Sequence, residues 1–328
     1  MKILHITPHL GGGVGTVIMD WMSKDKNHDY SLACLDYVNS KAVEWSIRES
    51  FPILDSAIRH GTWDSLCWSI SYYDIVLVHY WDHPMLEELF SRLLPDCRMV
   101  FWCHKNIRWN KVFPYPDRFI NTSPVQKYGS ECIWSTGNMD RFLAIEPKPH
   151  EGFNIGTVIS KKMDVSKTFG MFMEIAGKIP DARFFWIGDA IPVNFMDFPD
   201  FTFTGKVDDV APYLAEMDVF AYPLRPDHYG TCEIALGEAM AAGVVPVVMD
   251  NPAERTIIVD GKSGYIEPDM ECFIDAFRFL RSKMLRHYMG LRAKDRAKEL
   301  YSIDNQIASW NQVFESMMQN PKTKRSPI

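Results

Sequence analysis

Short apolar runs alternate with longer amphipathic stretches along the whole chain, and several of the runs end in Gly, Pro or His. Such runs are typical of buried strands that give way to loops, and the stretches between them are typical of helices. The apolar runs predict strands at 2–7, 75–79, 99–103, 153–158, 183–187, 219–222 and 244–249. The amphipathic stretches predict helices at 14–22, 85–94, 167–179, 234–242 and 272–286. This alternation predicts an α/β fold with parallel sheets covered by helices.

The alternation occurs twice, and the polar, proline-containing segment 145–152 separates the two series. Such a segment is typical of a linker. We therefore expect two doubly wound, Rossmann-like domains, one over 1–148 and one over 152–308, and a last amphipathic helix within 301–319. Doubly wound sheets bind ligands at the carboxyl ends of their strands. Two such domains would face each other across a cleft, where we expect the functional site.

The composition narrows the class of protein. The chain has 328 residues, 47% of them hydrophobic, and a formal net charge of −7, which argues against a general nucleic-acid binder. Its seven cysteines include no C-x-x-C pair, so a reducing, cytoplasmic location fits better than a disulfide framework or a zinc ribbon. No run of eighteen apolar residues occurs, so we expect no membrane-spanning helix.

A glycine-rich segment, 8–16, joins the first predicted strand to the first predicted helix. Gly12 and Gly13 allow positive φ and close approach of the backbone, and the start of a helix presents free N–H groups to an anion. Phosphate binding is the functional interpretation, and a tight turn without a ligand is the alternative. The segment is not the G-x-G-x-x-G dinucleotide fingerprint, because Thr16 occupies the last glycine position.

A second glycine-containing loop lies in 222–248, between a predicted strand and a short predicted helix. The N–H groups of Gly230, Thr231 and Cys232 would face an anion there. Glu238 lies further along the same helix, where its carboxylate can accept hydrogen bonds from vicinal hydroxyls. A phosphate beside a sugar diol describes a nucleotide.

The stretch 230–248 resembles the donor-binding signature of the retaining glycosyltransferases of family 4, which have the two-domain GT-B fold. Further similarities to this family lie at 11–15, 74–79, 101–104, 205–207 and 260–264. The resemblance implies that His104 is the active-site histidine and that Val207 lies in the loop near the base of the donor. It also implies transfer with retention, and a C-terminal helix, 309–328, that crosses back to the N-terminal domain.

The acidic pair of the family is altered in this chain. The family has two glutamates eight positions apart, but the position eight before Glu238 is Gly230. Either Asp227 or Glu233 takes the first acidic role, and Glu233 is the preferred candidate.

The cations expected around the donor diphosphate also differ from the family pattern. Thr157 stands where the family has an arginine. The available cations are Lys161, Lys162 and Lys167, of which Lys167 matches the family lysine that opens the next helix, and Arg225 could share the role. Cations and N–H groups are the largest available source of stabilisation for the negative charge that develops on a leaving diphosphate.

The sequence does not favour a metal cofactor. The chain contains no D-x-D sequence, which weakens a role for a divalent metal. His79, Asp82 and His83 could form a metal cluster, but polar residues at the end of a strand are the simpler interpretation. We expect no cofactor apart from the substrate, a UDP- or GDP-linked sugar.

His104 and the residues after it are candidates for the acceptor side. His104 could hydrogen-bond the donor sugar or the reacting hydroxyl, and a histidine that only ends a strand is the alternative. Trp102, Lys105 and Trp109 belong to a segment, 102–118, that interleaves aromatic and cationic residues. Such residues could stack on an acceptor sugar, bind an anionic lipid headgroup or touch a membrane surface. The alternative is a segment that is half core and half solvated.

The resemblance, together with these residues, implies a retaining, metal-independent glycosyltransferase with His104, Lys167 and Glu233 as its catalytic residues. It would transfer a sugar to a hydroxyl of a polysaccharide or lipid-linked glycan, in the cytoplasm or at the inner face of the membrane. The alternatives are a GT-B nucleotide-sugar epimerase and a non-catalytic nucleotide or glycan binder. Glycosylation of a DNA base has little support, because the chain is acidic and no nucleic-acid partner is expected.

Overall fold

The computed structural model describes residues 1–54, 63–105, 116–126, 130–159, 165–188, 200–225 and 232–325. The chain divides into two compact units. The first unit consists of Met1–Asn138, Tyr229–Cys232 and Ile303–Ile328, and the second consists of Met139–His228 and Glu233–Ser302. The proline-containing segment 145–152 therefore belongs to the second unit, and the end of the chain belongs to the first.

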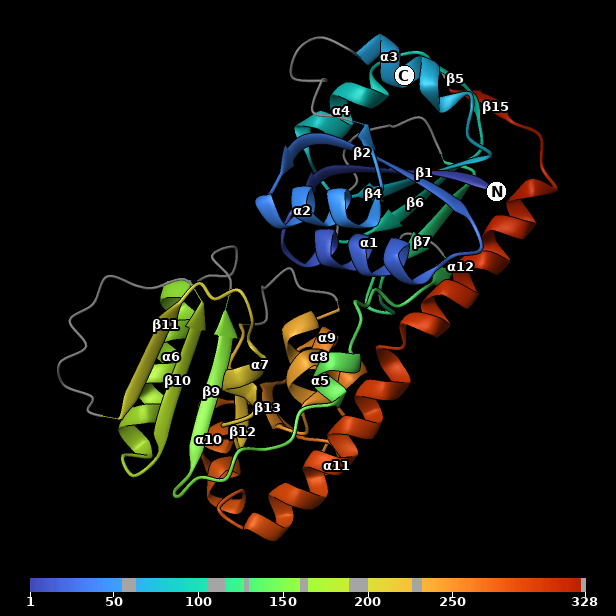
Figure 1. Cartoon of the computed structure of the whole chain (residues 1–328). Helices are drawn as coiled ribbons and strands as arrows, with labels where there is room; N and C mark the ends of the chain where they lie inside the picture. The colour runs from blue at the N-terminus through green and yellow to red at the C-terminus, as the bar shows by residue number, and fades with distance from the viewer. Residues whose placement is uncertain are drawn as a thin grey trace. The chain divides into compact units, whose positions relative to one another are not determined.

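The first unit is built on a parallel sheet with the strand order β3-β2-β1-β4-β6-β7-β8 (Figure 1). The strands are β1 (Lys2–Leu10), β2 (Asp29–Val38), β3 (Ile53–Leu54), β4 (Ile75–Tyr80), β6 (Met99–Cys103), β7 (Arg118–Asn121) and β8 (Glu131–Cys132). The strand order reverses between β1 and β4, so the sheet is doubly wound with its switch point there. Ligands bind such sheets beside the switch point, at the carboxyl ends of the strands.

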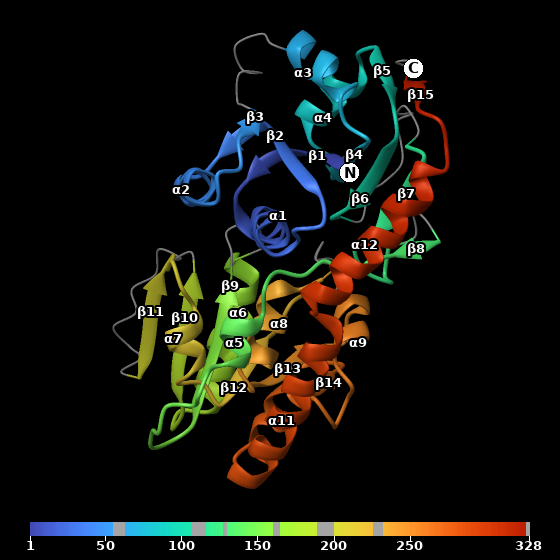
Figure 2. The ribbon, with the colours of Figure 1, turned by 45° about the vertical axis from the view of Figure 1, so that its right-hand side comes forward.

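Helices and a short second sheet complete the first unit. The helices are α1 (Gly12–Lys24), α2 (Ser40–Glu49), α3 (Trp63–Ile70), α4 (Pro84–Phe90) and α12 (Ile303–Met318). The predicted helix 85–94 is too long, because Leu94 already begins β5 (Leu94–Cys97). β5 pairs antiparallel with β15 (Thr323–Arg325), which follows α12 along this unit (Figure 2). None of the described helices is long and apolar enough to cross a membrane.

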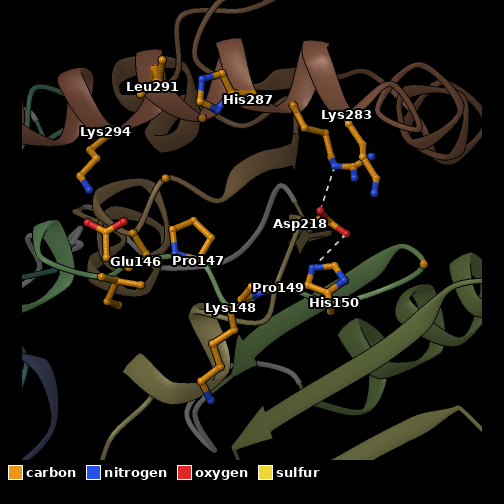
Figure 3. A pocket seen from close by; sticks show the side chains of 16 residues that line it. Glu146, Pro147, Lys148, Pro149, His150, Asp218, Lys283, His287, Leu291 and Lys294 are labelled. Carbon is orange, nitrogen blue, oxygen red and sulfur yellow. Dashed lines mark ion pairs between the residues drawn. The ribbon is translucent and has the colours of Figure 1, made fainter.

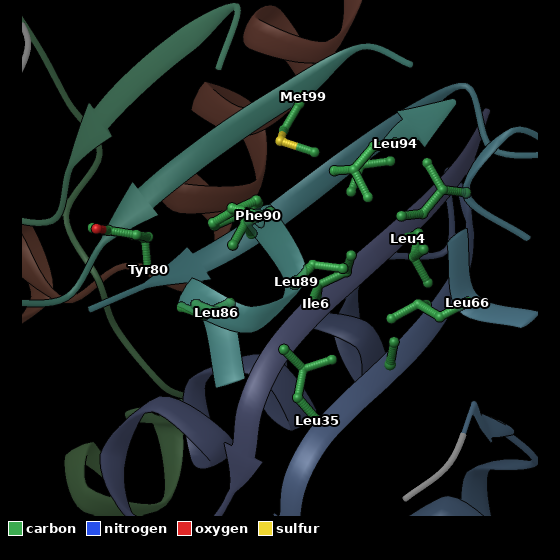
Figure 4. Close-up of a cluster of buried hydrophobic side chains, with 14 of the residues drawn as sticks. Leu4, Ile6, Leu35, Leu66, Tyr80, Leu86, Leu89, Phe90, Leu94 and Met99 are labelled. Carbon is green, nitrogen blue, oxygen red and sulfur yellow. The ribbon is translucent and has the colours of Figure 1, made fainter. Parts of the chain in front are cut away.

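One hydrophobic cluster fills one side of the sheet of the first unit (Figure 4). It joins side chains of β1, β4 and β6 to those of α3 and α4, and each of its buried members is at most 6% exposed. Leu86, Leu89 and Phe90 have the three- and four-residue spacing that places them on one face of α4. Burying each side chain of this size contributes about 1.5–3 kcal/mol, so this face holds α4 against the sheet.

An aromatic cluster attaches α12 to the first unit. The ring of Trp310 lies 5.4 Å from that of Trp21 in α1 and 5.3 Å from that of Trp102 in β6, between centroids. The amphipathic helix predicted within 301–319 is confirmed. Its apolar face is buried, since five of its members are at most 8% exposed: Ile303, Ile307, Trp310, Phe314 and Met317.

The second unit is built on another parallel sheet, with the strand order β11-β10-β9-β12-β13-β14. The strands are β9 (Asn154–Ile159), β10 (Arg183–Gly188), β11 (Phe201–Gly205), β12 (Val219–Tyr222), β13 (Val245–Met249) and β14 (Tyr265–Glu267). The helices are α5 (Asp140–Leu143), α6 (Val165–Lys178), α7 (Ala211–Leu214), α8 (Ile234–Ala241), α9 (Pro252–Ile257), α10 (Met270–Phe279) and α11 (Lys283–Leu300). The order reverses between β9 and β12, so this sheet is also doubly wound, as predicted. The cleft between two such domains stays a prediction.

The predicted helix 272–286 is wrong, because this stretch belongs to two helices. α10 ends at Phe279 and α11 begins at Lys283. Between them the hydroxyl of Ser282 accepts a hydrogen bond from the N–H of Leu285 at 3.3 Å. A serine in this position caps the start of a new helix, and the apolar periodicity on either side of it concealed the break.

Glycines let α11 approach α8 closely. A Cβ at Gly290 of α11 would lie 2.3 Å from the carbonyl oxygen of Gly243, which follows α8. A Cβ at Gly237 of α8 would lie 2.6 Å from the ring of Tyr301, which follows α11. No larger residue fits at either position without movement, so these contacts fix α8 within its unit.

Candidate functional site

The glycine-rich turn lies at the carboxyl end of β1, beside the switch point of the first sheet. β1 ends at Leu10 and α1 begins at Gly12, whose φ is +64°. A Cβ at Gly12 or Gly13 would meet nothing within 4 Å, whereas one at Gly15 would lie 3.1 Å from the backbone of Leu10. The N-cap residue, Gly11, provides no side-chain hydrogen bond to α1. The space beside Gly12 and Gly13 at the start of α1 is thus open, as binding of an anion at a helix N-terminus requires.

Three histidines form a hydrogen-bonded row in the first unit. Nδ1 of His5 lies 2.9 Å from Nε2 of His79, and Nδ1 of His79 lies 3.0 Å from Nε2 of His104. The ring centroids are 5.2 Å apart in both pairs. His5 and His79 are fully buried, and His104 is partly exposed at the end of the row.

The register of the parallel strands produces this row. His5 lies opposite Leu77 of β4, and His79 comes two residues later in that strand. His79 lies opposite Trp102 of β6, and His104 comes two residues later in the chain. Since side chains two residues apart point to the same face of a sheet, the rings form a diagonal row that climbs toward the carboxyl ends.

Burial keeps the three imidazoles neutral. It lowers the pKa of His5 and of His104 to about 3. It also lowers the pKa of His79 well below its usual value, and repulsion from the two neighbouring histidines acts in the same direction. At neutral pH each ring therefore carries one N–H donor and one acceptor nitrogen.

The predicted role of Trp102 as an acceptor-binding residue is wrong, because the residue is buried. Its side chain is fully buried and packs against Trp21 and Trp310. Its indole N–H donates to the carbonyl oxygen of Ile133 at 3.1 Å. A ring held in this way belongs to the core and has no face for an acceptor sugar. The alternation of side chains in β6 turned it inward.

The other two predicted acceptor residues lie next to His104. The ammonium of Lys105 is 3.6 Å from a carboxylate oxygen of Asp82, and both side chains are partly exposed, by 40% and 45%. The contact of Lys105 with an acceptor stays a prediction. Trp109 lies outside the described residues.

The grouping of His79, Asp82 and His83 as metal ligands is not seen in the structure. Both ring nitrogens of His79 face other histidines, and Nδ1 of His83 accepts the N–H of Met85 at 3.3 Å, which caps α4. Over the described part of the chain, no group of three His, Cys, Asp or Glu side chains is placed to hold a metal ion.

Glu233 lies at the start of α8 with φ of +38°, and its carboxylate is turned inward. The Tyr222 hydroxyl, at the carboxyl end of β12, donates to its Oε2 at 2.6 Å, and only 8% of Glu233 is exposed. The hydroxyl of Tyr301 donates to the backbone carbonyl oxygen of Glu233 at 3.4 Å. This arrangement makes Glu233 a residue that holds the start of α8, so the structure does not support a direct catalytic role for it.

Glu238 lies on α8, the helix that follows β12 in the chain, and is partly exposed. The partly buried Val207 follows β11. The buried Cys232 precedes α8 in the chain but belongs to the first unit, where its thiol donates to the carbonyl oxygen of Thr122 at 2.9 Å. Glu238 and Val207 thus follow strands of the second sheet in the chain, on the side of the carboxyl ends, where a doubly wound sheet binds a ligand.

Several predicted donor residues lie outside the described part of the chain. These are Lys161, Lys162, Gly230 and Thr231, while Lys167 lies in the first turn of α6 and its side chain is not described. Their roles stay predictions.

A pocket of about 470 Å³ lies in the second unit at the amino ends of its strands, opposite the carboxyl ends (Figure 3). Asp218, Gly152 and Gly243, which line it, come just before β12, β9 and β13. Asp218 is paired with Arg286 at 2.9 Å and lies 3.7 Å from His150. This pocket is at the amino ends of the strands, so it is not the predicted donor site.

His5 and Tyr222 are the functional candidates that sequence reasoning missed, and His79 was considered there only as a possible metal ligand. A histidine stands inside or at the end of three otherwise apolar strands, in 2–7, 75–79 and 99–104. That repetition is a signal, but joining the residues into one row requires the strand order and register.

Comparison with solved structures shows the fold of this protein. A glycosyltransferase from Rickettsia africae ESF-5 has a TM-score of 0.74 at 13% identity, over 97% of this chain and 99% of that chain. HepE from Anabaena, solved in complex with UDP, has a TM-score of 0.73 at 12% identity, over 96% and 100% of the chains. Sucrose-phosphate synthase from Thermosynechococcus elongatus has a TM-score of 0.69 at 13% identity, over 97% and 99%. The chain therefore has the GT-B fold of the glycosyltransferases.

The family match is more specific. Residues 156–283 match the family model described as glycosyl transferases group 1. The matched stretch runs from β9 to the first residue of α11 and includes α8 with Glu238. The curated proteins give no sequence match.

Proposed function

We propose that this protein is a retaining glycosyltransferase that moves a sugar from a nucleoside-diphosphate donor to a hydroxyl group without a metal ion. The observation that carries the proposal is the match of 156–283 to the glycosyl transferases group 1 model. The matched stretch contains the switch point of the second sheet and the helix α8 that begins beside it.

On the donor side, each part of the carboxyl edge of the second sheet has a role. Glu238, partly exposed on α8, accepts hydrogen bonds from the ribose hydroxyls. The N–H groups at the start of α8 and Lys167 at the start of α6 stabilise the diphosphate. Val207 contacts the base. UDP is the preferred nucleotide because the HepE structures of the same fold hold UDP or UDP-glucose.

The transfer step breaks the bond between the sugar C1 and the diphosphate oxygen. The acceptor oxygen forms the new bond to C1 on the same face, and the acceptor proton passes to the leaving phosphate. The uncapped start of α1 and His104 provide hydrogen-bond donors from the first unit. The acceptor is a polysaccharide or lipid-linked glycan, met in the cytoplasm or at the inner face of the membrane.

The experiment that tests this function measures release of nucleoside diphosphate from UDP- and GDP-linked sugars with a panel of glycan and lipid-linked hydroxyl acceptors. The proposal expects acceptor-dependent release from one donor series, a product with the donor's anomeric configuration, and the same rate with EDTA. An inverted product would contradict retention, and inhibition by EDTA that Mg²⁺ reverses would contradict metal independence.

A non-catalytic nucleotide or glycan binder is the second candidate. It is favoured by Glu233, the preferred candidate for the first acidic role, whose carboxylate is turned inward. Asp227, the other candidate, lies outside the described residues. Tight donor binding together with no release from any donor and acceptor pair would support this candidate over the transferase.

A further inference from the structure

We propose that His5, His79 and His104 act as one hydrogen-bond chain that fixes His104 as an Nδ1–H donor toward the substrate. The inference deepens the proposed function, because it assigns positioning roles to His5 and His79 in the same site. It rests on the two short nitrogen-to-nitrogen contacts of the row and on the burial of its inner members.

The contacts couple the protonation of the three rings. A neutral imidazole has one N–H and one lone pair, and both nitrogens of His79 are used, one toward each neighbour. If His79 donates to His104, its other nitrogen must accept from His5. The row therefore has two self-consistent arrangements: all three rings carry the proton on Nδ1, or all three carry it on Nε2.

The inner end of the row decides between them. Nε2 of His5 is buried and has no hydrogen-bond partner among the described residues. With the protons on Nε2, a buried N–H would point into the core without an acceptor. With the protons on Nδ1, only an unused lone pair lies there, and orphaned N–H groups are the rarer case in proteins. The chain therefore points its donors from His5 toward His104.

The consequence for His104 is a defined chemical role. Its Nε2 accepts from His79, so its Nδ1–H is the group left for a ligand, and an N–H donor suits a sugar hydroxyl or a phosphate oxygen. The ring does not act as a general base, because its lone pair is occupied. Among the described residues, Lys105 follows His104 in the chain, and its ammonium pairs with Asp82 at 3.6 Å.

A metal ion does not explain the row. Each pair of nitrogens faces the other at hydrogen-bond distance, which leaves no space for a shared ion between them. In the part of the chain that the structure describes, these rings join no group of potential metal ligands. A purely structural row is the remaining alternative, and the experiment is designed to separate it from a positioning role.

The first measurement is a long-range ¹H–¹⁵N spectrum of the full-length, ¹⁵N-labelled protein without substrate, with the histidines assigned by single substitution. The proposal expects His5, His79 and His104 all as neutral Nδ1–H forms that do not titrate between about pH 5 and 8. Detection of Nε2–H on His104, or titration of any of the three in this range, would overturn it. This result does not depend on the enzyme activity.

The second measurement compares His79→Gln and His79→Glu, two variants whose new side chains have nearly the same size. The amide of Gln can accept from His5 and donate to Nε2 of His104, so it preserves the direction of the chain. An ionised Glu only accepts, so it forces the proton of His104 onto Nε2 and removes the donor from the substrate side. It also raises the pKa of His104, because it favours the imidazolium.

We expect His79→Gln to keep kcat within about twofold and His79→Glu to lower it about tenfold at pH 8, with little change in KM, as for loss of one transition-state hydrogen bond. The kcat of His79→Glu should recover as the pH falls, because the imidazolium again carries an Nδ1–H. Equal kcat and equal pH profiles for the two folded variants would overturn the positioning role. Absence of turnover in the wild type would instead count against the proposed function, while the spectrum would still test the chain.

Discussion

Glu233 and Glu238 lie five residues apart, and their surroundings give them different roles. Glu233 accepts a hydrogen bond from Tyr222 inside the second unit, whereas Glu238 is partly exposed on α8. The sequence assigns Glu238 to the donor through its place in a recognisable signature. It cannot show that Glu233 turns inward, because that depends on the φ of +38° at the start of the helix and on a tyrosine from β12.

Glu238→Ala should weaken UDP binding about tenfold or more, because a hydrogen bond to a charged group contributes about 1.5–3 kcal/mol. Calorimetric titration with UDP and with 2′,3′-dideoxy-UDP measures the effect. The wild type should lose affinity when the hydroxyls are removed, and the variant should not discriminate between the two ligands. Full discrimination by the variant would refute the assignment of Glu238 to the ribose.

Tyr222→Phe should lower the free energy of unfolding by about 1–3 kcal/mol, because it leaves the buried carboxylate of Glu233 without the hydroxyl that bonds it. Denaturant unfolding measures this loss. Glu233→Gln is the matched comparison, since an amide oxygen can still accept from Tyr222 and the donor affinity should stay unchanged. Loss of turnover in Glu233→Gln with unchanged stability and donor binding would mean that Glu233 acts on the substrate directly.

At the scale of elements, apolar runs located the central parallel strands β1, β4, β6, β9, β10, β12 and β13 but not β7, β11 or β14, and the amphipathic pattern located α1, α6, α8 and α12. α11 could not be located in this way, because its buried side is formed by Arg286, Met289, Gly290, Ala293 and Ala297 rather than by large apolar side chains. β2 is similarly hidden, since Ser31 and Asp36 interrupt its apolar positions. The histidine row combines three strands, so only the register reveals it.

Gly290→Ala tests the close contact between α11 and the end of α8. The new methyl group would meet the carbonyl oxygen of Gly243 at 2.3 Å, and we expect a loss of about 1–3 kcal/mol in the free energy of unfolding. Gly170→Ala in α6 is the matched control, because nothing lies within 4 Å of its Cβ position and alanine favours a helix by up to about 1 kcal/mol. Equal stability of the two variants would contradict this packing.

At the scale of the whole molecule, the two doubly wound sheets follow from the sequence, because the strand and helix alternation occurs twice. The end of the chain is harder to assign from pattern alone. The polar segment 145–152 lies within the second unit, a few residues after the units divide at 138/139. α12 and β15 belong to the first unit through the aromatic contacts of Trp310 and the pairing with β5. Those contacts join residues about 200–300 positions apart in the chain, which no local pattern encodes.

The buried histidines predict that acid destabilises the protein. The folded state keeps His5 and His79 neutral, whereas the unfolded chain protonates them below about pH 6.5, so the unfolded state binds more protons. The free energy of unfolding should fall as the pH drops below about 6.5, by up to about 1.4 kcal/mol per pH unit for each group. Denaturant unfolding from pH 7 to 5 measures the slope, and His79→Gln should make it shallower. Identical slopes would show that His79 is not held neutral.

The central claim is that the second unit binds a nucleoside diphosphate, and a thermal-shift panel of UDP, GDP, ADP, dTDP and NAD tests it most directly. A ligand that binds only the folded state raises its stability by RT ln(1 + [L]/Kd). The account predicts a clear rise in the melting temperature with UDP or GDP, largest for UDP, and a smaller rise in Glu238→Ala. A rise with NAD alone, or with none of the five ligands, would contradict it.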